Sequence, residues 1–267
     1  MKESAILMQE PRNRQLHVWL LAGTGEGPSL ASALLARGFQ VSVSVVTEAA
    51  LRPYNALSLH HRWAGALSSV GAIVARIQHA RIDLLVDATH PFATQVSAQL
   101  VQAVNQVSCP LVRFERALEP APAAQVIERV DAIPSDALAG KRVLLALGAR
   151  HLAAVVPPLR AAGAQPHARV LPTPLALRQA VAAGLADEHL ALLQPLQGTV
   201  PGRLETALCR HWQIDAVVCR QSGGVTERCW HQVCSELGLD LWLLRRPGPP
   251  ASVPVVHSVE QMLTLLG

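Results

Sequence analysis

The stretch that decides the fold is LHVWLLAGTGEGPSLASALLARGFQVSVSVV, residues 16–46. Residues 16–22 are apolar enough for a strand buried on both faces, and they end in a glycine-rich turn. Residues 28–37 favour a helix that closes at Gly38. Residues 40–46 are rich in β-branched side chains and predict a second strand. Together these features predict a parallel βαβ unit.

The same alternation runs through the rest of the chain. Further strands are expected at 82–88, 109–114, 124–129, 142–147, 167–171, 190–194, 214–219, 239–244 and 253–257. Helices are expected at 67–80, 148–156, 174–184, 201–211, 223–237 and 258–266, with another ending near 107. This pattern predicts an α/β fold whose parallel sheets are covered by helices on both faces.

Two domains are expected for a chain of 267 residues, because a domain usually takes about 150 residues. The Pro- and Ala-rich run 119–122 is the best linker candidate. We therefore expect a loose leader at 1–15 and two Rossmann-like lobes, at 16–118 and 119–267, with a ligand cleft between them. The strand near 253–257 lies far from its own series and could pair with either lobe, which would exchange strands between lobes.

The composition excludes several classes of protein. Half of the residues are hydrophobic and 16% are charged, which excludes a disordered chain. Aromatic residues are only 3%, and the net charge of +4 forms no basic block, so no nucleic-acid partner is expected. Only two of the 23 basic residues are lysines. Arginine binds carboxylates and phosphates at two points, which favours a small anionic ligand, although a coding preference explains the same count.

No membrane partner or metal is expected. No apolar run approaches the roughly 20 residues that span a bilayer, and the first residues are too polar for a signal peptide, so we expect a cytoplasmic protein. The five cysteines form no Cys-x-x-Cys pair and are expected to be small buried hydrophobes. The alternative is a metal site, but the paired spacing of zinc knuckles is missing from its residues, Cys209, His211, Cys229, His231 and Cys234.

Ligands of open α/β sheets bind beyond the carboxyl ends of the strands. In lobe one, the residues there are Thr24, Gly25, Glu26, Thr47, Glu48, Thr89, His90, Arg113 and Arg116. In lobe two, they are Gly148, Arg150, Arg169, Gly198, Arg220, Ser222, Gly223 and Gly224.

Three of these loops have both a functional and a structural interpretation. Gly23-x-Gly25 is half of a dinucleotide fingerprint whose third glycine is Pro28, so it either cradles a phosphate or packs a helix tightly. Ser222-Gly223-Gly224 either turns its N–H groups toward an anion beside Arg220 or simply caps a helix. Thr89-His90 either lines a ligand site or caps the next helix, with Pro91 in its first turn. Asp87, which precedes this loop, needs a partner if it is buried.

Seven strings occur in order along the chain: LLAGTGEGPSLASALLARG (20–38), VSVVTE (43–48), DATHPFATQVSAQ (87–99), LVRFER (111–116), ARVLPTP (168–174), LQGTVPGRLETAL (196–208) and CRQSGG (219–224). The string DATHPFA beside the TGE loop and a late SGG is the most specific combination. Taken together, the strings resemble the precorrin-6A reductase family of cobalamin biosynthesis, and the resemblance extends over about residues 17–247.

The resemblance implies an NADPH-dependent reductase of an anionic tetrapyrrole, with oligomeric state left open. The predicted substrate side is Thr24, Gly25, Thr47, Thr89, Arg113 and Arg116. If the reaction uses a proton donor of the protein, His90 is the first candidate, and Glu26 or Glu48 is the next. The cofactor side would be Gly148, Arg150, Gly198, Arg220, Ser222, Gly223 and Gly224. The chain departs from the family pattern in three places: it has no aromatic residue after Gly198, it has Arg220 in place of a lysine, and it has Ala149 in place of a cation.

No catalytic dyad or triad is visible, which suits hydride transfer, because cofactor chemistry and alignment supply the rate. Two other functions remain open from the sequence. One is a tetrapyrrole transferase that uses another nucleotide cofactor, and the other is a nucleotide-binding module without catalysis.

Overall fold

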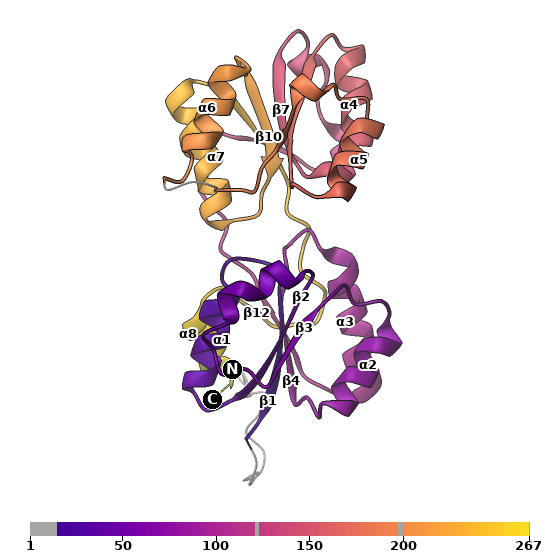
Figure 1. Ribbon diagram of the computed structural model, residues 1–267, viewed down its shortest axis with the longest axis vertical. Coiled ribbons are helices and arrows are strands. Elements are labelled where there is room, and N and C mark those ends of the chain that lie inside the picture. The colour runs from indigo at the N-terminus through magenta and orange to yellow at the C-terminus, as the bar shows by residue number, and fades with distance from the viewer. Residues whose placement is uncertain (1–14, 121–122, 197–199, 267) are drawn as a thin grey trace. The chain divides into compact units, whose positions relative to one another are not determined.

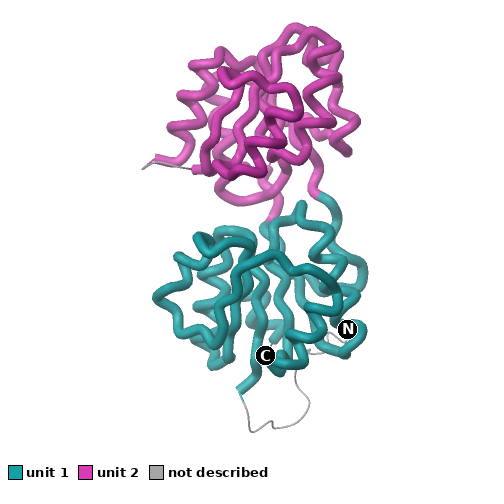
Figure 2. The backbone as a smooth tube through the Cα atoms, turned by 45° about the vertical axis from the view of Figure 1, so that its right-hand side comes forward, with its two compact units in different colours: residues 1–116, 247–267 teal, residues 117–246 magenta. Residues whose placement is uncertain are grey.

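The computed structural model describes residues 15–120, 123–196 and 200–266. The chain divides into two compact units, one formed by residues 1–116 with 247–267 and one formed by residues 117–246 (Figure 2). The predicted leader at 1–15 lies outside the described residues except for Gln15. Each unit holds one six-stranded sheet in which every strand pair is parallel, so the predicted α/β class with two parallel sheets is confirmed.

The sheet of unit 1 has the strand order β12-β5-β4-β1-β2-β3. This is the order of the dinucleotide-binding fold, except that the sixth strand comes from the end of the chain. The strands are β1 (His17–Ala22), β2 (Gln40–Val45), β3 (His61–Ala64), β4 (Leu84–Ala88), β5 (Leu111–Phe114) and β12 (Val255–Val256).

Helices cover both faces of this sheet (Figure 1). One face packs against α1 (Gly27–Ala36) and α8 (Val259–Leu266), where Leu20, Leu30 and Met262 share a core without exposed surface. The other face packs against α2 (Val70–His79) and α3 (Thr94–Val107) through Trp19, Ile73 and Leu100. A 3-10 helix, Glu48–Tyr54, follows β2.

Unit 2 repeats the plan, with the order β6-β11-β10-β7-β8-β9. Here the sixth strand comes from the segment that enters the unit. The strands are β6 (Gln125–Ile127), β7 (Arg142–Ala146), β8 (Gln165–Val170), β9 (Leu190–Leu192), β10 (Ala216–Arg220) and β11 (Asp240–Leu244). The helices are α4 (Leu152–Ala161), α5 (Pro174–Ala182), α6 (Arg203–His211) and α7 (Gly224–Leu237), with short 3-10 helices at Val130–Ala132, Asp136–Leu138, Ala149–His151 and Asp187–His189.

Two features of the domain and sheet arrangement differ from the sequence prediction. Residues 247–267, expected in the second lobe, group with unit 1 instead. The reason is β12, which adds to the edge of β5 because Arg113 N–H donates to the Pro254 carbonyl at 2.8 Å and Glu115 N–H donates to Val256 at 2.9 Å. Strand β3 was not predicted, because its sequence HRWA has no apolar alternation and lies at an exposed sheet edge.

A buried histidine in unit 2 predicts a loss of stability in acid. His167 is 3% exposed, and neither ring nitrogen has a hydrogen-bond partner among the described residues. Burial, then His189 and Arg142, lowers its pKa from 6.5 to about 4. Between these two pH values, His167 binds a proton in the unfolded chain but not in the folded chain. The free energy of unfolding therefore falls as the pH drops from 6.5 toward 4.

We expect the titration of His167 to lower the free energy of unfolding by about 2 kcal/mol at pH 5. His167→Phe keeps the ring packing against Trp212 and removes the titration. Urea unfolding between pH 7.5 and 4.5 is the measurement. The variant should be at least as stable as the native protein at pH 7.5 and should fall less steeply, whereas parallel pH profiles would refute the assignment.

Candidate active site

The predicted site residues of unit 1 lie at the carboxyl edge of its sheet. Ser44, Leu21, Asp87 and Arg113 occupy one level across β2, β1, β4 and β5. Because the strands are parallel, the loops beyond this level emerge at the same edge. These loops carry Thr24, Gly25, Glu26, Thr47, Glu48, Thr89, His90 and Arg116.

Two of these loops meet where the strand order reverses, between β1 and β4, the usual ligand position in open α/β sheets. Gly23 N–H donates to the Ala88 carbonyl at 3.1 Å. A Cβ at Gly23 would lie 3.0 Å from the backbone nitrogen of His90. The absence of a side chain at Gly23 therefore lets the loop 23–26 lie directly against the loop that holds His90.

The next part of the glycine run has a packing role. A Cβ at Gly27, the first residue of α1, would collide with the hydroxyl of buried Tyr54 and lie 2.9 Å from the Cβ of Ala22. Burial raises the pKa of Tyr54 to about 12, so its hydroxyl stays protonated. Gly25 differs, because a Cβ there would meet nothing within 4 Å. Tight helix packing, the structural interpretation of this run, therefore holds at Gly27, and Gly25 is left open to a ligand.

Gly27→Ala should lower the free energy of unfolding by about 1–3 kcal/mol, because it overpacks the contact between α1 and Tyr54. Gly25→Ala is the matched control and should change stability by less than about 0.5 kcal/mol. Adding Tyr54→Phe to Gly27→Ala should restore part of the loss. Urea titration of the four proteins tests this, and equal losses for the two glycine variants would rule out the packing role.

Asp87, at the end of β4, is paired as its burial requires. Its Oδ1 accepts hydrogen bonds from Thr89 N–H at 3.0 Å and Thr89 Oγ1 at 2.7 Å, and its Oδ2 accepts one from Ser97 Oγ at 2.7 Å. The Arg113 guanidinium lies 2.8 Å from Asp87 and 3.0 Å from Glu115. This network fixes the conformation of the Thr89 loop.

Arg113, expected among the substrate ligands, therefore lies mainly inside the protein. Its side chain is 2% exposed, and its Nη1 also donates to Thr89 Oγ1 at 3.0 Å. It reaches a cavity of about 190 Å³ that Pro91 and Glu115 help to line. The geometry gives Arg113 a positioning role for the loop at the end of β4.

The three proton-donor candidates have different surroundings. His90 Nδ1 accepts a hydrogen bond from Phe92 N–H at 3.2 Å, so a neutral His90 carries its proton on Nε2. Glu26 forms an ion pair with Arg116 at 3.6 Å, which joins the loops after β1 and β5. Glu48 is exposed and begins the 3-10 helix after β2. His90 and Glu26 thus lie on loops at the strand-order reversal, and Glu48 lies one strand away.

The helix after His90 begins later than the sequence predicts. Helix α3 begins at Thr94, and Ala93 precedes it without a side-chain cap. Pro91 therefore lies in a turn before the helix rather than in its first turn. The loop 89–93 is longer than predicted, and the hydrogen bonds of Asp87 stabilise it.

The corresponding edge of unit 2 is rich in arginine. Its strand order reverses between β7 and β10, which end beside Gly148 and at Arg220. Gly148 has a φ of +90°, a conformation that favours glycine, and a Cβ there would lie 4.0 Å from Arg220 Nη2. Exposed Arg150 follows, and its Nε donates to His151 Nε2 at 3.0 Å. Two guanidinium groups therefore lie on the loops at this reversal.

A third arginine lies on the neighbouring strand. Arg169 of β8 is 8% exposed, its guanidinium lies 5.6 Å from the Trp230 ring centroid, and its Nε has no hydrogen-bond partner among the described residues. The family resemblance assigns Arg169 no role. The sequence does carry one signal for a role of Arg169, which is its position on the second βα strand of this sheet. Dinucleotide folds that bind NADP place an arginine near that strand.

These three arginines affect the titration of their neighbours. Burial, then repulsion from Arg150 and Arg169, lowers the pKa of Arg220 to about 10, so Arg220 stays cationic at neutral pH. Burial, then Arg150 and Arg220, lowers the pKa of His151 to about 4, so that ring is neutral. Positive charge is thus concentrated at this edge, which favours an anionic ligand.

The Ser222-Gly223-Gly224 loop differs from its functional interpretation. Gly223 N–H donates to the Glu227 carboxylate at 2.5 Å, and Gly224 N–H donates to Glu119 at 2.9 Å. Arg228 also donates to Glu119, at 2.8 Å. Carboxylates of the chain thus occupy the place at the start of α7 that was predicted for a phosphate, while Ser222 lies buried beside it. Gly198 lies outside the described residues.

The alternative metal cluster is not assembled. Cys209, Cys229 and Cys234 pack in the hydrophobic core of unit 2, where burial raises the pKa of Cys209 and of Cys234 to about 12. Among the described residues, no three His, Cys, Asp or Glu side chains are placed to hold a metal ion. Over the same residues, no helix is long and apolar enough to cross a bilayer.

Comparisons with known proteins agree with this architecture. The family model described as precorrin-6x reductase CbiJ/CobK matches residues 17–267. A cobalt-precorrin-6A reductase of Synechocystis sp. is 36% identical over 242 residues, covering 86% of this chain and 88% of that protein. A precorrin-6A reductase of Mycobacterium tuberculosis is 31% identical, covering 91% and 94%. The solved structure of a CobK precorrin-6A reductase superposes with a TM-score of 0.72 at 25% identity, covering 94% and 96%.

The family match spans both units and includes the strand-order reversal of each sheet. The relatives align with this chain over nearly their whole lengths. The chain belongs to the precorrin-6x reductase CbiJ/CobK family of oxidoreductases.

Proposed function

We propose that this protein reduces a double bond of a precorrin-6A macrocycle, with or without cobalt, and that NADPH is the hydride donor. The observation that carries the proposal is the family match over residues 17–267, which includes both dinucleotide-type sheets. The ligand cleft predicted between the lobes, the cytoplasmic location and the lack of a nucleic-acid partner stay predictions.

The edge of unit 2 fits the phosphates of NADPH. Arg150 and Arg220 lie at its strand-order reversal, and the missing side chain of Gly148 leaves room there for the cofactor. Arg169 is buried on the second strand of this sheet, and its Nε has no hydrogen-bond partner among the described residues. In dinucleotide folds, an arginine near this strand accommodates the additional phosphate of NADP. Because Gly223 and Gly224 already donate to carboxylates, we assign phosphate binding to these side chains rather than to the start of α7.

The edge of unit 1 fits the macrocycle. Gly25 has open space beside it, and Thr24 and Thr47 offer hydroxyl groups at the same edge. The hydroxyl of Thr89 already bonds to Asp87 and Arg113, so Thr89 shapes the loop beside the ligand. Arg116 supplies a cation for the carboxylate arms of the substrate, and Glu26 orients it at 3.6 Å. His90 gives the proton of the reduction and regains a proton from solvent. NADPH supplies the hydride when bound, and the chain supplies alignment and charge.

The first test is binding. A ligand at about 100 times its dissociation constant adds about 2.7 kcal/mol of apparent stability. NADPH should raise the melting temperature more than NADH, ATP or S-adenosylmethionine does. A shift with S-adenosylmethionine alone would instead support the transferase alternative.

Turnover separates the reductase from a binding module without catalysis. NADPH absorbance should fall when authentic precorrin-6A is added, and should stay constant without it. If NADPH binds but is not consumed in the presence of authentic substrate, the protein is a nucleotide-binding module and the proposed reduction is wrong.

A further inference from the structure

A large cavity lies at the end of the unit 1 sheet opposite to the proposed active site. It has a volume of about 970 Å³ and opens at the amino ends of β1, β2 and β3, beside α2. His17, Gln40 and His61 are the first residues of those three strands. Since the catalytic candidates lie beyond the carboxyl ends, this cavity is separate from their site.

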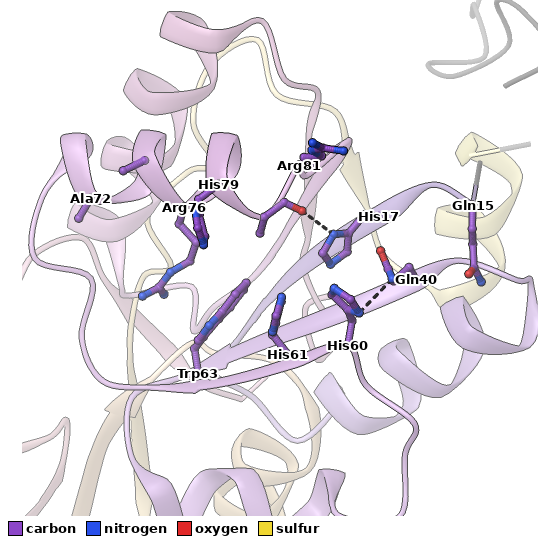
Figure 3. Close-up of a pocket in the computed structure, with 12 residues that line it drawn as sticks. Gln15, His17, Gln40, His60, His61, Trp63, Ala72, Arg76, His79 and Arg81 are labelled. Atoms are coloured by element: carbon purple, nitrogen blue, oxygen red, sulfur yellow. Dashed lines mark hydrogen bonds between the residues drawn. The ribbon is translucent and has the colours of Figure 1, made fainter. Parts of the chain in front are cut away.

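A row of rings forms one wall of the cavity. The side chains of His61 and Trp63 on β3, and of His60 just before it, point toward α2 (Figure 3). The His61 ring stacks on Trp63 with centroids 5.0 Å apart, and the His60 ring lies 4.3 Å from His61. On the opposite side, the Arg76 guanidinium of α2 lies 4.7 Å from the Trp63 centroid. These contacts form a preorganised wall of imidazole, indole and guanidinium groups.

The deepest histidine is held in one tautomer. His17 Nδ1–H donates to the Ala80 carbonyl at 2.9 Å, and its Nε2 accepts from Ser42 Oγ at 2.8 Å. Burial, and then the neighbouring imidazoles, keeps the pKa of His17 below its usual value of 6.5. The two hydrogen bonds hold the His17 ring in place at the floor of the cavity. Burial, then His60 and His79, also lowers the pKa of His61, so a bound anion has to offset these effects before His61 takes up a proton.

Among the described residues that line the cavity, every side chain with a permanent charge is cationic. The twelve described lining residues include Arg76, Arg81 and four histidines, and none of the twelve is a carboxylate. Six of the described lining residues are titratable or charged. They are His17 of β1, His60 just before β3, His61 of β3, Arg76 and His79 of α2, and Arg81 in the turn after α2. Asp83 lies behind them, where it accepts the His17 backbone N–H at 2.8 Å.

We propose that this cavity binds a small organic anion that carries several phosphate or carboxylate groups. Its volume lies near the upper end of the range for small-molecule sites, which is too large for a single inorganic ion. Two guanidinium groups and the imidazoles supply donors for such groups, and Trp63 with His61 supplies a flat apolar surface beside them. Because binding favours protonated imidazoles, the affinity rises as the pH falls.

Two probes distinguish the kinds of acidic group: inorganic triphosphate and benzenehexacarboxylate. Calorimetry on the full chain at pH 6 and pH 8 measures their binding without NADPH, and variants at the cavity that keep the arginines of unit 2 show which part of the binding belongs to the cavity. Histidine-ring NMR then shows whether His60, His61 and His79 take up protons when the probe binds. We expect at least one probe to bind, more tightly at pH 6, with these rings shifted.

The double variant Arg76→Gln/Arg81→Gln should weaken binding at least about tenfold, because it removes two charge-assisted donors. Exposed Arg178, on α5 of unit 2, is the matched control, and Arg178→Gln should leave the affinity unchanged. If loss of the Arg76 stacking lowers the melting temperature, His79→Gln/Arg81→Gln gives the same test with two exposed side chains.

Binding of either probe with these losses supports the site and identifies the acidic group. The inference is overturned if neither probe binds, if both double variants bind like the native protein, or if the affinity does not depend on pH. Turnover of NADPH is not part of this test, so the proposed reductase activity can fail or hold independently.

Discussion

An Arg113→Ala variant is expected to lose about 3–5 kcal/mol of unfolding free energy, the usual cost of removing one partner from a buried ion pair. Arg113 joins Asp87 at 2.8 Å and Glu115 at 3.0 Å, and all three side chains are at least 94% buried. Without the guanidinium, two carboxylates remain buried without their cation. Urea titration monitored by tryptophan fluorescence measures the loss.

Exposed Arg37 at the end of α1 is the control for this prediction. Arg37→Ala should change stability by less than about 0.5 kcal/mol. Arg113→Lys should recover part of the loss, because it restores the charge without the two-point geometry. A loss below about 1 kcal/mol for Arg113→Ala would mean that the network does not stabilise the Thr89 loop.

Arg220→Ala is expected to weaken NADPH binding by about 1.5–3 kcal/mol, which is roughly 10- to 150-fold in the dissociation constant. Arg220 stays cationic at neutral pH although burial and its neighbouring arginines lower its pKa to about 10. NADPH titration by fluorescence, together with a thermal melt, separates binding from stability.

Arg210→Ala is the control for the Arg220 variant, since Arg210 is exposed in the last turn of α6, which leads to the opposite, amino end of β10. It should bind NADPH like the native protein. If Arg220→Ala leaves both the dissociation constant and the KM for NADPH unchanged, Arg220 is not part of the cofactor site.

The sequence predicts most of the architecture because buried parallel strands are continuous apolar runs. Residues 17–22 and 84–88 lie in the sheet as expected. The partner of the last strand was not predictable, because pairing between β12 and β5 joins segments about 140 residues apart, and no local pattern encodes that contact. Strand β3 was missed for a different reason, since an exposed edge strand can carry His61 and Arg62 in sequence.

The candidate site was likewise predictable only in part. Loop positions such as Gly25, Thr89 and Arg220 follow directly from where strands end. Side-chain partners at long separation do not, and Glu119 is an example, since it reaches Gly224 from 105 residues away. The burial of Arg113 had a local signal, because residues two apart on a strand share a face and Glu115 is therefore its neighbour.

Transfer of label from cofactor to macrocycle tests the central claim most directly. NADPH that carries deuterium at the transferable position is mixed with the protein and precorrin-6A, and the product is analysed by mass spectrometry and NMR. The account predicts a dihydro product with one deuterium on a ring carbon and one proton from solvent. Consumption of labelled NADPH without deuterium in the macrocycle, or recovery of unreduced substrate, would contradict it.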